Sequence, residues 1–191
     1  GAVQPATTTD AMVEYIDILP TFLEIAGAPR TPDLDGRSFL PVLRGEAKAH
    51  KEFVFAEYTN RGVVGGSDHY GIRSVRSARY KYIWNFTPQD PYANASMNNE
   101  TYRSWTRAAA AGDAIATTAI ARYLHRDEIE FYDVIADPEE FNNLASDPKL
   151  ADERARHRAQ LDSWMKAQGD RGQATEMEAL QHMKRYVEDP G

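Results

Sequence analysis

The first hydrophobic run of the chain has the spacing of an amphipathic helix. Residues 12–27 place apolar side chains three or four positions apart, which brings them to one face of a helix. These apolar positions are Met12, Ile16, Leu19, Leu23 and Ala26. Asp10 is a suitable cap before the helix, and Gly27 is a suitable end. Pro20 stands in the middle of the pattern, so we expect it to kink the helix or to begin a second one.

Four later segments alternate between apolar and polar residues, as strands with one buried face do. They are residues 52–58, 71–76, 79–86 and 128–134. A turn at Ser77-Ala78 would join the second and third segments into a hairpin. A glycine-rich loop separates the first segment from the second.

Helical patterns fill much of the remaining chain. The alanine-rich residues 99–125 break at Gly112-Asp113, which predicts two helices, and residues 149–168 and 174–187 predict two more. Strands and helices do not alternate regularly, so a parallel sheet is not indicated. The pattern predicts an α+β fold, with a small, mainly antiparallel sheet of about four strands packed against helices.

Composition narrows the possible functions. The chain has 191 residues, of which 42% are hydrophobic, and this is enough for a packed core. Its net charge of −7 argues against broad binding to nucleic acid, and no apolar stretch approaches the roughly 18 residues that a membrane span needs. The absence of cysteine excludes disulfides, thiolate metal ligands and cysteine nucleophiles.

The densest group of carboxylates lies in residues 130–148, EFYDVIADPEEFNNLASDP. A calcium-binding EF-hand loop that began at Asp133 would need an oxygen ligand and a glycine where the sequence has Ile135 and Pro138. The adjacent glutamates would diverge on a turn, which does not suit a pair of acid–base groups. We therefore expect a structural anchor, in which the asparagines bond to local backbone and Leu144 enters the core.

None of the five histidines has the spacing of a zinc site. His157 and His182 fall on helices that we expect to be exposed, so both should be solvated. His69 lies in the glycine-rich loop between two strands, beside Asp68 and Tyr70. Because loops held by a rigid scaffold often carry ligand contacts, His69 is a candidate binding residue.

Four cationic residues cluster on the predicted hairpin. They are Arg73, Arg76, Arg79 and Lys81. Such a group could bind sulfate or phosphate through charge-assisted hydrogen bonds, or it could keep a sheet edge from pairing. We favour the second role for Arg76 and Arg79. The sequence contains no Gly-x-Ser-x-Gly nucleophile motif, and the residues alone do not indicate a catalytic set.

Four motifs, in order, resemble the C-terminal part of sulfatases of the alkaline-phosphatase-like superfamily. Residues 13–29 resemble the family's Asp-x-x-Pro-Thr helix, and residues 34–45 resemble its Asp-Gly-x-Ser-Leu-x-Pro-Leu-Leu segment. Residues 72–85 resemble its Ile-Arg-Ser/Thr…Tyr-Lys-Tyr-Ile hairpin, and residues 130–148 resemble its Glu-Leu-Tyr-Asp-x-x-x-Asp-Pro-x-Glu-x-x-Asn-Leu signature. The insertion at residues 90–127 is most similar to the heparan N-sulfatase (N-sulfoglucosamine sulfohydrolase) branch.

The resemblance implies that the catalytic groups of the enzyme lie outside this chain. The family's nucleophile is a formylglycine made within Cys/Ser-x-Pro-x-Arg, and no match to that motif occurs here. The family's Ca²⁺ ligands lie upstream of the Asp-x-x-Pro-Thr helix. The chain is therefore expected to be a fragment that is inactive alone, with residues 1–50 ending the catalytic domain and residues 51–191 forming a C-terminal antiparallel-sheet subdomain.

The implied activity is hydrolysis of sulfate esters or N-sulfate groups on a glycan, with heparan-type glucosamine favoured. The family suggests a periplasmic or secreted enzyme. Two alternatives remain open at this point: a non-catalytic glycan-binding or interaction module, and part of a related phosphodiesterase or phosphonate hydrolase. The upstream nucleophile motif would discriminate between them.

The expected partners are the missing N-terminal catalytic half and a sulfated glycan, and neither nucleic acid nor a membrane. The first helix should expose Met12, Ile16 or Leu19, or cover them with a second copy of the chain. No metal ligand is predicted. The residues expected to contact substrate follow the first strand, at its end and in the glycine-rich loop after it. They are Glu57, Asn60, Arg61 and His69.

Overall fold

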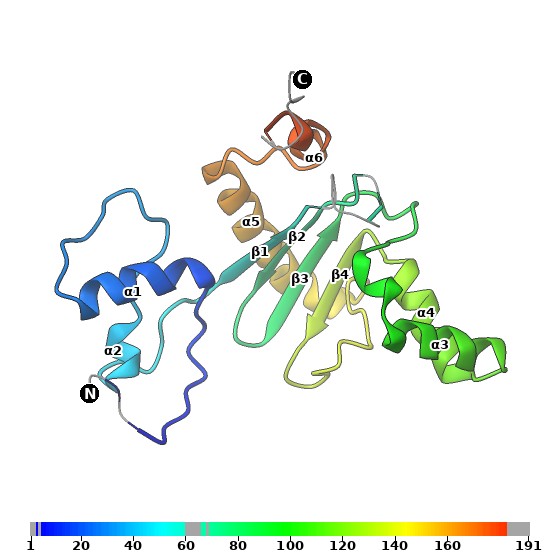
Figure 1. Cartoon of the computed structure of the whole chain (residues 1–191), viewed down its shortest axis with the longest axis horizontal. Coiled ribbons are helices and arrows are strands. Elements are labelled where there is room, and N and C mark those ends of the chain that lie inside the picture. Colours follow the sequence, from blue (N-terminus) through cyan, green and yellow to red (C-terminus); the bar gives the residue numbers. More distant parts are fainter. Residues whose placement is uncertain (1–2, 4, 60–65, 68, 183–191) are drawn as a thin grey trace, which may run out of the picture. The chain divides into compact units, whose positions relative to one another are not determined.

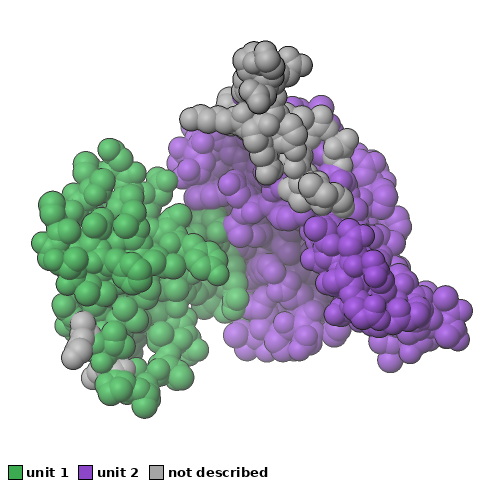
Figure 2. All heavy atoms as spheres, viewed as in Figure 1, with its two compact units in different colours: residues 1–55, 76–79 green, residues 56–75, 80–191 purple. Residues whose placement is uncertain are grey.

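A computed structural model describes residue 3 and residues 5–59, 66–67 and 69–182. The chain divides into two compact units, shown in different colours in Figure 2. The first unit contains residues 1–55 and 76–79, and the second contains residues 56–75 and 80–191. The sequence predicted that a catalytic domain ends at residue 50 and that a C-terminal subdomain follows. This boundary stays a prediction, because the division into compact units does not show which residues belong to a catalytic domain.

The first unit is built on helix α1, which covers Ile18–Ile25 and follows a 3-10 turn at Tyr15–Asp17. The helix was expected to begin near Met12, and this is wrong. Met12 instead forms an isolated antiparallel β-bridge with Lys51. The helical segment starts only after Glu14, whose backbone N–H donates to Asp17 Oδ2 at 2.9 Å. Pro20 lies in the first turn of α1, where a missing N–H costs little, so it does not break the helix.

Asp17 ties the first unit together. Its side chain is fully buried, with Lys51 Nζ 2.8 Å from Oδ1 and His50 Nε2 3.3 Å from Oδ2. Burial alone would raise the pKa of Asp17, but Lys51 and the backbone N–H groups of Arg37 and Glu14 hold that pKa below its ordinary value. The charged carboxylate therefore links the start of α1 to the chain that precedes the sheet. Helix α2, Leu40–Leu43, is a single short helical turn in the same unit.

Four strands form one open antiparallel sheet in the order β1-β2-β3-β4 (Figure 1), which confirms the predicted fold class. They are Val54–Tyr58, Ile72–Arg76, Tyr80–Asn85 and Ile129–Asp133. Tyr82 of β3 pairs with Phe131 of β4, and both are buried. The sequence order of the strands is also their spatial order, although a long excursion separates β3 from β4.

Helix α5, Ala151–Ala167, packs on the sheet through a stripe of buried residues four positions apart. Leu161 and Met165 belong to this stripe, and so does His157. The prediction that His157 is solvated is wrong: its side chain is fully buried, with its ring 5.5 Å from that of Phe131, and Nδ1 lies 2.9 Å from the Glu153 carbonyl oxygen. The side chain of His182 lies outside the described part of the chain.

The excursion between β3 and β4 folds as two packed helices, α3 (Glu100–Ala110) and α4 (Ala114–Leu124). They break where the sequence predicts. Gly112 has a φ of 91°, a conformation that favours glycine, and Asp113 Oδ1 accepts hydrogen bonds from the first N–H groups of α4. Helix α6, Gln173–Glu178, begins one residue before the predicted range of 174–187. Residues 183–187 of that range lie outside the described residues.

The acidic stretch is an anchor, as its sequence suggested, but Leu144 is only half-buried and does not enter the core, and the Asn142 side chain donates to Asp137 rather than to backbone. Asn143 Oδ1 accepts from the backbone N–H of Phe131 at 2.9 Å, and the N–H of Leu144 donates to the Phe131 carbonyl at 2.7 Å. Asp137 Oδ2 accepts from the N–H of Asn142 at 2.7 Å. These bonds fold the segment after β4 back against that strand.

Candidate functional site

Two of the predicted substrate contacts, Glu57 and His69, flank the connection between β1 and β2. Glu57 is on β1, and 61% of its side chain is exposed. His69 is in the turn before β2. Because β1 and β2 are antiparallel neighbours, the C-terminal end of β1 and the N-terminal end of β2 lie side by side at the same end of the sheet. Asn60 and Arg61 lie outside the described residues, so the structure does not place them.

The backbone at His69 has an unusual conformation. Its φ is 60°, in the left-handed region that few residues other than glycine adopt. The His69 carbonyl then accepts a hydrogen bond from the N–H of Gly71 at 3.0 Å, which closes a tight turn around Tyr70. Strained backbone of this kind occurs often at ligand sites. The His69 side chain is half-buried in this turn, and the neighbouring Tyr70 is fully buried.

Gly71 is required by close packing. A Cβ atom at this position would lie 2.4 Å from Cγ of Glu176 and 2.6 Å from Cδ2 of Phe86. The absence of a side chain lets the carboxylate of Glu176 approach the start of β2. The turn at His69 is therefore fixed from below by the segment that follows α5.

A buried ionic cluster lies under this end of the sheet. Arg73 is 1% exposed, with Nε 2.5 Å from Asp170 Oδ2 and Nη2 2.9 Å from Glu176 Oε1. The same Glu176 oxygen accepts from Thr59 Oγ1 at 2.8 Å. Arg73 Nη1 also donates to the Ile72 carbonyl at 3.0 Å. Burial by itself would lower the pKa of Arg73, but the two carboxylates raise that pKa above its ordinary value.

This geometry excludes the anion-binding role considered for Arg73. A fully buried guanidinium that is already paired with two carboxylates does not bind a sulfate or phosphate group from solvent. The sheet-edge role, which was favoured for Arg76 and Arg79, is wrong as well, because β2 and β3 are the two central strands of the sheet. Glu57 Oε2 lies 3.8 Å from Arg73 Nε, so the exposed Glu57 is the part of this network that faces outward. The sequence could have predicted the burial of Arg73, because the alternation along β2 places Arg73 on the same face as the buried Val75.

Aromatic rings support the other side of the turn. The ring of Tyr92 lies 5.2 Å from that of Tyr70 and 5.7 Å from that of Tyr58. Burial raises the pKa of Tyr70 to about 12, so its hydroxyl stays protonated at neutral pH. The arrangement at this end of the sheet is thus a rigid base that carries an exposed carboxylate and an imidazole, groups that suit hydrogen bonds to a polar ligand.

A second buried carboxylate, Glu130, stabilises the far side of the sheet. Its Oε1 accepts from Asn85 Nδ2 at 2.7 Å and from Arg126 Nε at 2.8 Å, and its Oε2 accepts from Tyr132 Oη at 2.7 Å. Burial would raise the pKa of Glu130, but Arg126, Tyr132 and Asn85 together hold that pKa below its ordinary value. Within the described ranges, no group of three or more His, Asp or Glu residues could hold a metal ion. The described residues thus do not fit a Ca²⁺ site.

Comparisons with known proteins assign the fold to a family. Residues 1–101 match the family model described as N-sulphoglucosamine sulphohydrolase, C-terminal. An ulvan-active sulfatase of Formosa agariphila is 33% identical over 170 residues, which are 88% of this chain and 32% of that protein. The human N-sulphoglucosamine sulphohydrolase is 29% identical over 168 residues, which are 82% of this chain and 32% of that protein.

Solved structures agree with this result. A 2-O GAG sulfatase has a TM-score of 0.60 at 24% identity, over 89% of this chain and 29% of that protein. A protein solved with its substrate D-glucosamine-2-N,6-O-disulfate has a TM-score of 0.61 at 21% identity, over 90% of this chain and 28% of its own. At these identities the likeness shows the fold alone.

None of the helices in the described ranges is both long and apolar enough to cross a bilayer. The chain spans about a third of the length of the curated relatives named above. The family model covers more than half of the chain, and all four sequence motifs occur in the order that the resemblance required. The chain belongs to the family of N-sulphoglucosamine sulphohydrolase C-terminal domains, which are parts of sulfatases.

Proposed function

We propose that this chain is the C-terminal part of a sulfatase that hydrolyses sulfate esters or N-sulfate groups on a glycan, with a heparan-type glucosamine favoured. The match of residues 1–101 to the N-sulphoglucosamine sulphohydrolase model carries this proposal. The relatives that support it include a human protein named for N-sulphoglucosamine and a sulfatase named for ulvan.

The groups that would attack sulfur are assigned to the part of the protein outside this chain. Formylglycine and Ca²⁺ would supply the nucleophile and the charge stabilisation there. The residues of this chain would bind and orient the glycan. Glu57, His69 and, with them, Asn60 and Arg61 would contact the sugar at the C-terminal end of β1. A carboxylate at Glu57 would accept hydrogen bonds from sugar hydroxyls, and this fixes orientation rather than supplying a reacting group.

The apolar face of α1 is proposed as the surface that packs against the catalytic part. Leu19 and Phe22 are 51% and 63% exposed, and Ile16 just before the helix is 47% exposed. The exposure of Ile16 and Leu19 confirms the expectation drawn from the sequence. A row of large apolar side chains on one helix is unusual on a free surface. A second copy of the chain is the alternative occupant, which sedimentation would reveal.

The proposed activity is tested with the full-length protein. Release of inorganic sulfate is measured from N-sulfated glucosamine, from 6-O-sulfated glucosamine and from a phosphonate monoester. Turnover of either sulfated sugar, proportional to protein concentration, supports the proposal. Turnover of the phosphonate with no release of sulfate would instead indicate the related phosphonate hydrolase.

The proposed contacts are tested with Glu57→Gln, because this change removes charge and keeps shape. We expect kcat/KM for the sulfated sugar to fall about tenfold, the value of one charged hydrogen bond. Glu46→Gln is the matched control, since Glu46 is also exposed but lies in the loop after α2. Equal kcat/KM in both variants would contradict the role of Glu57. A periplasmic or secreted location is proposed from the family, and cell fractionation of the source organism tests it.

A further inference from the structure

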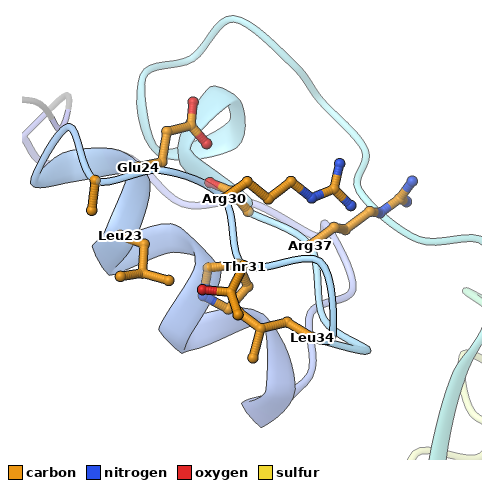
Figure 3. Close-up of a pocket in the computed structure, with 9 residues that line it drawn as sticks. Leu23, Glu24, Arg30, Thr31, Leu34 and Arg37 are labelled. Atoms are coloured by element: carbon orange, nitrogen blue, oxygen red, sulfur yellow. The ribbon is translucent and has the colours of Figure 1, made fainter.

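The first unit contains a cavity that the proposed catalytic arrangement does not use. Its volume is about 360 Å³, within the range of small-ligand pockets, and it lies between α1 and the loop that follows it (Figure 3). Its lining combines apolar side chains with charged ones. The lining residues are Pro20, Leu23, Glu24, Ala28, Arg30, Thr31, Leu34, Arg37 and Ser38.

Two arginines define the chemistry of this cavity. The side chains of Arg30 and Arg37 extend in the same direction, and both guanidinium groups point away from the carboxylate of Glu24 (Figure 3). Both residues are exposed. Across the part of the chain that the structure describes, neither guanidinium forms an ion pair or a side-chain hydrogen bond, even though Asp33 and Asp35 lie in the same loop.

The loop that carries Arg37 is held rigidly, although the side chain is not. The Arg37 backbone N–H donates to Asp17 Oδ1 at 3.0 Å, and the next turn is fixed by Thr21 Oγ1, which accepts from the N–H of Phe39 at 3.1 Å. Gly36 lies so close to the chain before α1 that a Cβ atom would be 1.9 Å from the Ile16 carbonyl oxygen. Backbone contacts therefore place Arg37 at the cavity. The fixed backbone lowers the entropic cost of binding a ligand, and the guanidinium is available for it.

The arginines that line a second cavity differ from these two, because their guanidinium groups form hydrogen bonds within the protein. The second cavity lies beside α4 and has a volume of about 450 Å³, and Arg122 and Arg126 line it. There Arg126 is held by both oxygens of Glu130, and Arg122 donates to the Glu140 carbonyl. Those guanidinium groups have structural partners. Arg30 and Arg37 have no such partner within the described residues, and unlike the equally exposed Arg44 they both line a cavity.

We propose that the Arg30–Arg37 cavity binds an anionic sugar unit of the glycan, at a distance from the bond that is cleaved. The guanidinium forks match the geometry of sulfate and carboxylate groups. The apolar side chains of Leu23 and Leu34 would contact the C–H face of the ring, and the hydroxyl of Thr31 would bond to a sugar hydroxyl. This inference rests on the proposed function in one respect: it takes the ligand to be a glycan.

The test uses the full-length protein and the double variant R30Q/R37Q. Calorimetry measures the Kd of a tetrasaccharide of N-sulfated glucosamine and uronate. We expect the Kd to rise about tenfold, since charged hydrogen bonds are lost. We also expect KM for this tetrasaccharide to rise with kcat unchanged, and the KM for N-sulfated glucosamine alone to stay the same, because a monosaccharide does not reach both sites.

Two further measurements are made. An unsulfated ligand shows which anionic group of the sugar is bound, and control variants show whether a change in Kd comes from the cavity arginines. The Kd of an unsulfated tetrasaccharide is compared between the native protein and R30Q/R37Q. If this Kd also rises in the variant, the arginines bind the uronate carboxylate. If it does not change, they bind the sulfate. R44Q is the matched control, because Arg44 is exposed in the same unit but does not line the cavity. R30Q alone is made as well, since Arg30 has no packing role that could impair folding.

The proposal is overturned if R30Q and R30Q/R37Q bind the sulfated tetrasaccharide as tightly as R44Q does. It is also overturned if the double variant loses thermal stability while its glycan affinity is unchanged, because the arginines would then hold an acidic segment of the protein itself. A protein that releases no sulfate from any sugar, yet binds the tetrasaccharide in an arginine-dependent manner, would contradict the proposed function and leave the binding site standing.

Discussion

The guanidinium of Arg73 and the carboxylate of Asp170 are separated by 97 positions in the sequence, yet Nε and Oδ2 lie 2.5 Å apart in the protein interior. This contact joins β2 to the segment after α5. Since Glu176 pairs with the same guanidinium, one buried cation holds two parts of the C-terminal segment against the sheet.

Replacement of Arg73 by Met should therefore be costly. The change would leave two carboxylates buried without their partner, and breaking such a pair costs about 3–5 kcal/mol in the free energy of unfolding. Chemical denaturation of the purified protein measures this loss. Arg76→Met is the control, because Arg76 on the same strand is exposed and should change stability by less than about 0.5 kcal/mol. Similar values for both variants would show that the buried cluster contributes little.

The Glu130 network predicts how stability depends on pH. The ordinary pKa of the group is 4.5, and the folded protein holds that pKa lower. As the pH falls below about 4.5, the unfolded chain binds a proton before the folded one does, so the contribution of Glu130 to stability is lost in that range. Glu130→Gln should weaken the protein at pH 7 by about 3 kcal/mol, because Arg126 loses its partner.

The same variant should also show a smaller decrease in stability between pH 5 and pH 3. Denaturation midpoints at several pH values measure this decrease. Glu128→Gln changes a carboxylate that is exposed two positions away, and it should keep the pH dependence of the native protein. A Glu130→Gln protein with an unaltered acid limb would show that another group governs acid stability.

If the apolar face of α1 is covered in the full-length protein, a polar substitution there should reduce stability more than one at an exposed apolar residue elsewhere. In the full-length protein, Phe22→Ser should reduce the free energy of unfolding by about 3 kcal/mol if the catalytic part covers this face. Ile115→Ser is the comparison, because Ile115 on α4 is 83% exposed and should tolerate the change. Sedimentation at two concentrations separates the occupants: a dimer that dissociates in Phe22→Ser would mean that a second copy covers the helix.

A substitution at His69 can distinguish a role in ligand binding from a role in folding. Asn tolerates the left-handed conformation, so His69→Asn should change the free energy of unfolding by less than about 0.5 kcal/mol. It should nevertheless lower kcat/KM for the sulfated sugar about tenfold, since the imidazole would no longer contact the ligand. His125→Asn, at an exposed position after α4, is the control. Loss of stability without loss of kcat/KM would assign His69 to the fold.

The strands were predictable because each has one buried face, and the alternation that this produces is visible in the sequence. The start of the first helix was not. Apolar periodicity reaches back to Met12, but the bond from Glu14 to Asp17 and the bridge from Met12 to Lys51 begin the helical segment three residues later. Local pattern cannot reveal a pairing with a residue that is nearly forty positions away.

Two polar residues are buried where the sequence predicted exposure (His157) or left two surface roles open (Arg73). His157 lies four positions before Leu161 and Arg73 two positions before Val75, so each shared the periodicity of a buried face. Because both residues are polar, their type predicts exposure, whereas their position in the periodic pattern predicts burial. In the structure both are buried. The partners that make burial possible, Asp170 and Glu176 for Arg73, come from distant segments. For the candidate site, the sequence located the end of the sheet, but it did not reveal the strained turn or the ionic support beneath it.

The burial of Asn85 has a practical consequence for producing this protein. Asn85-Phe86-Thr87 fits the acceptor sequence for N-linked glycosylation, but the Asn85 side chain is fully enclosed, and its amide nitrogen donates to the Asp127 carbonyl and to Glu130. A carbohydrate attached there during secretion would displace both acceptors and block β3 from meeting β4. A host cell that modifies the nascent chain at this asparagine should yield misassembled material, so expression in bacteria, which leave the amide unmodified, is the preferable route.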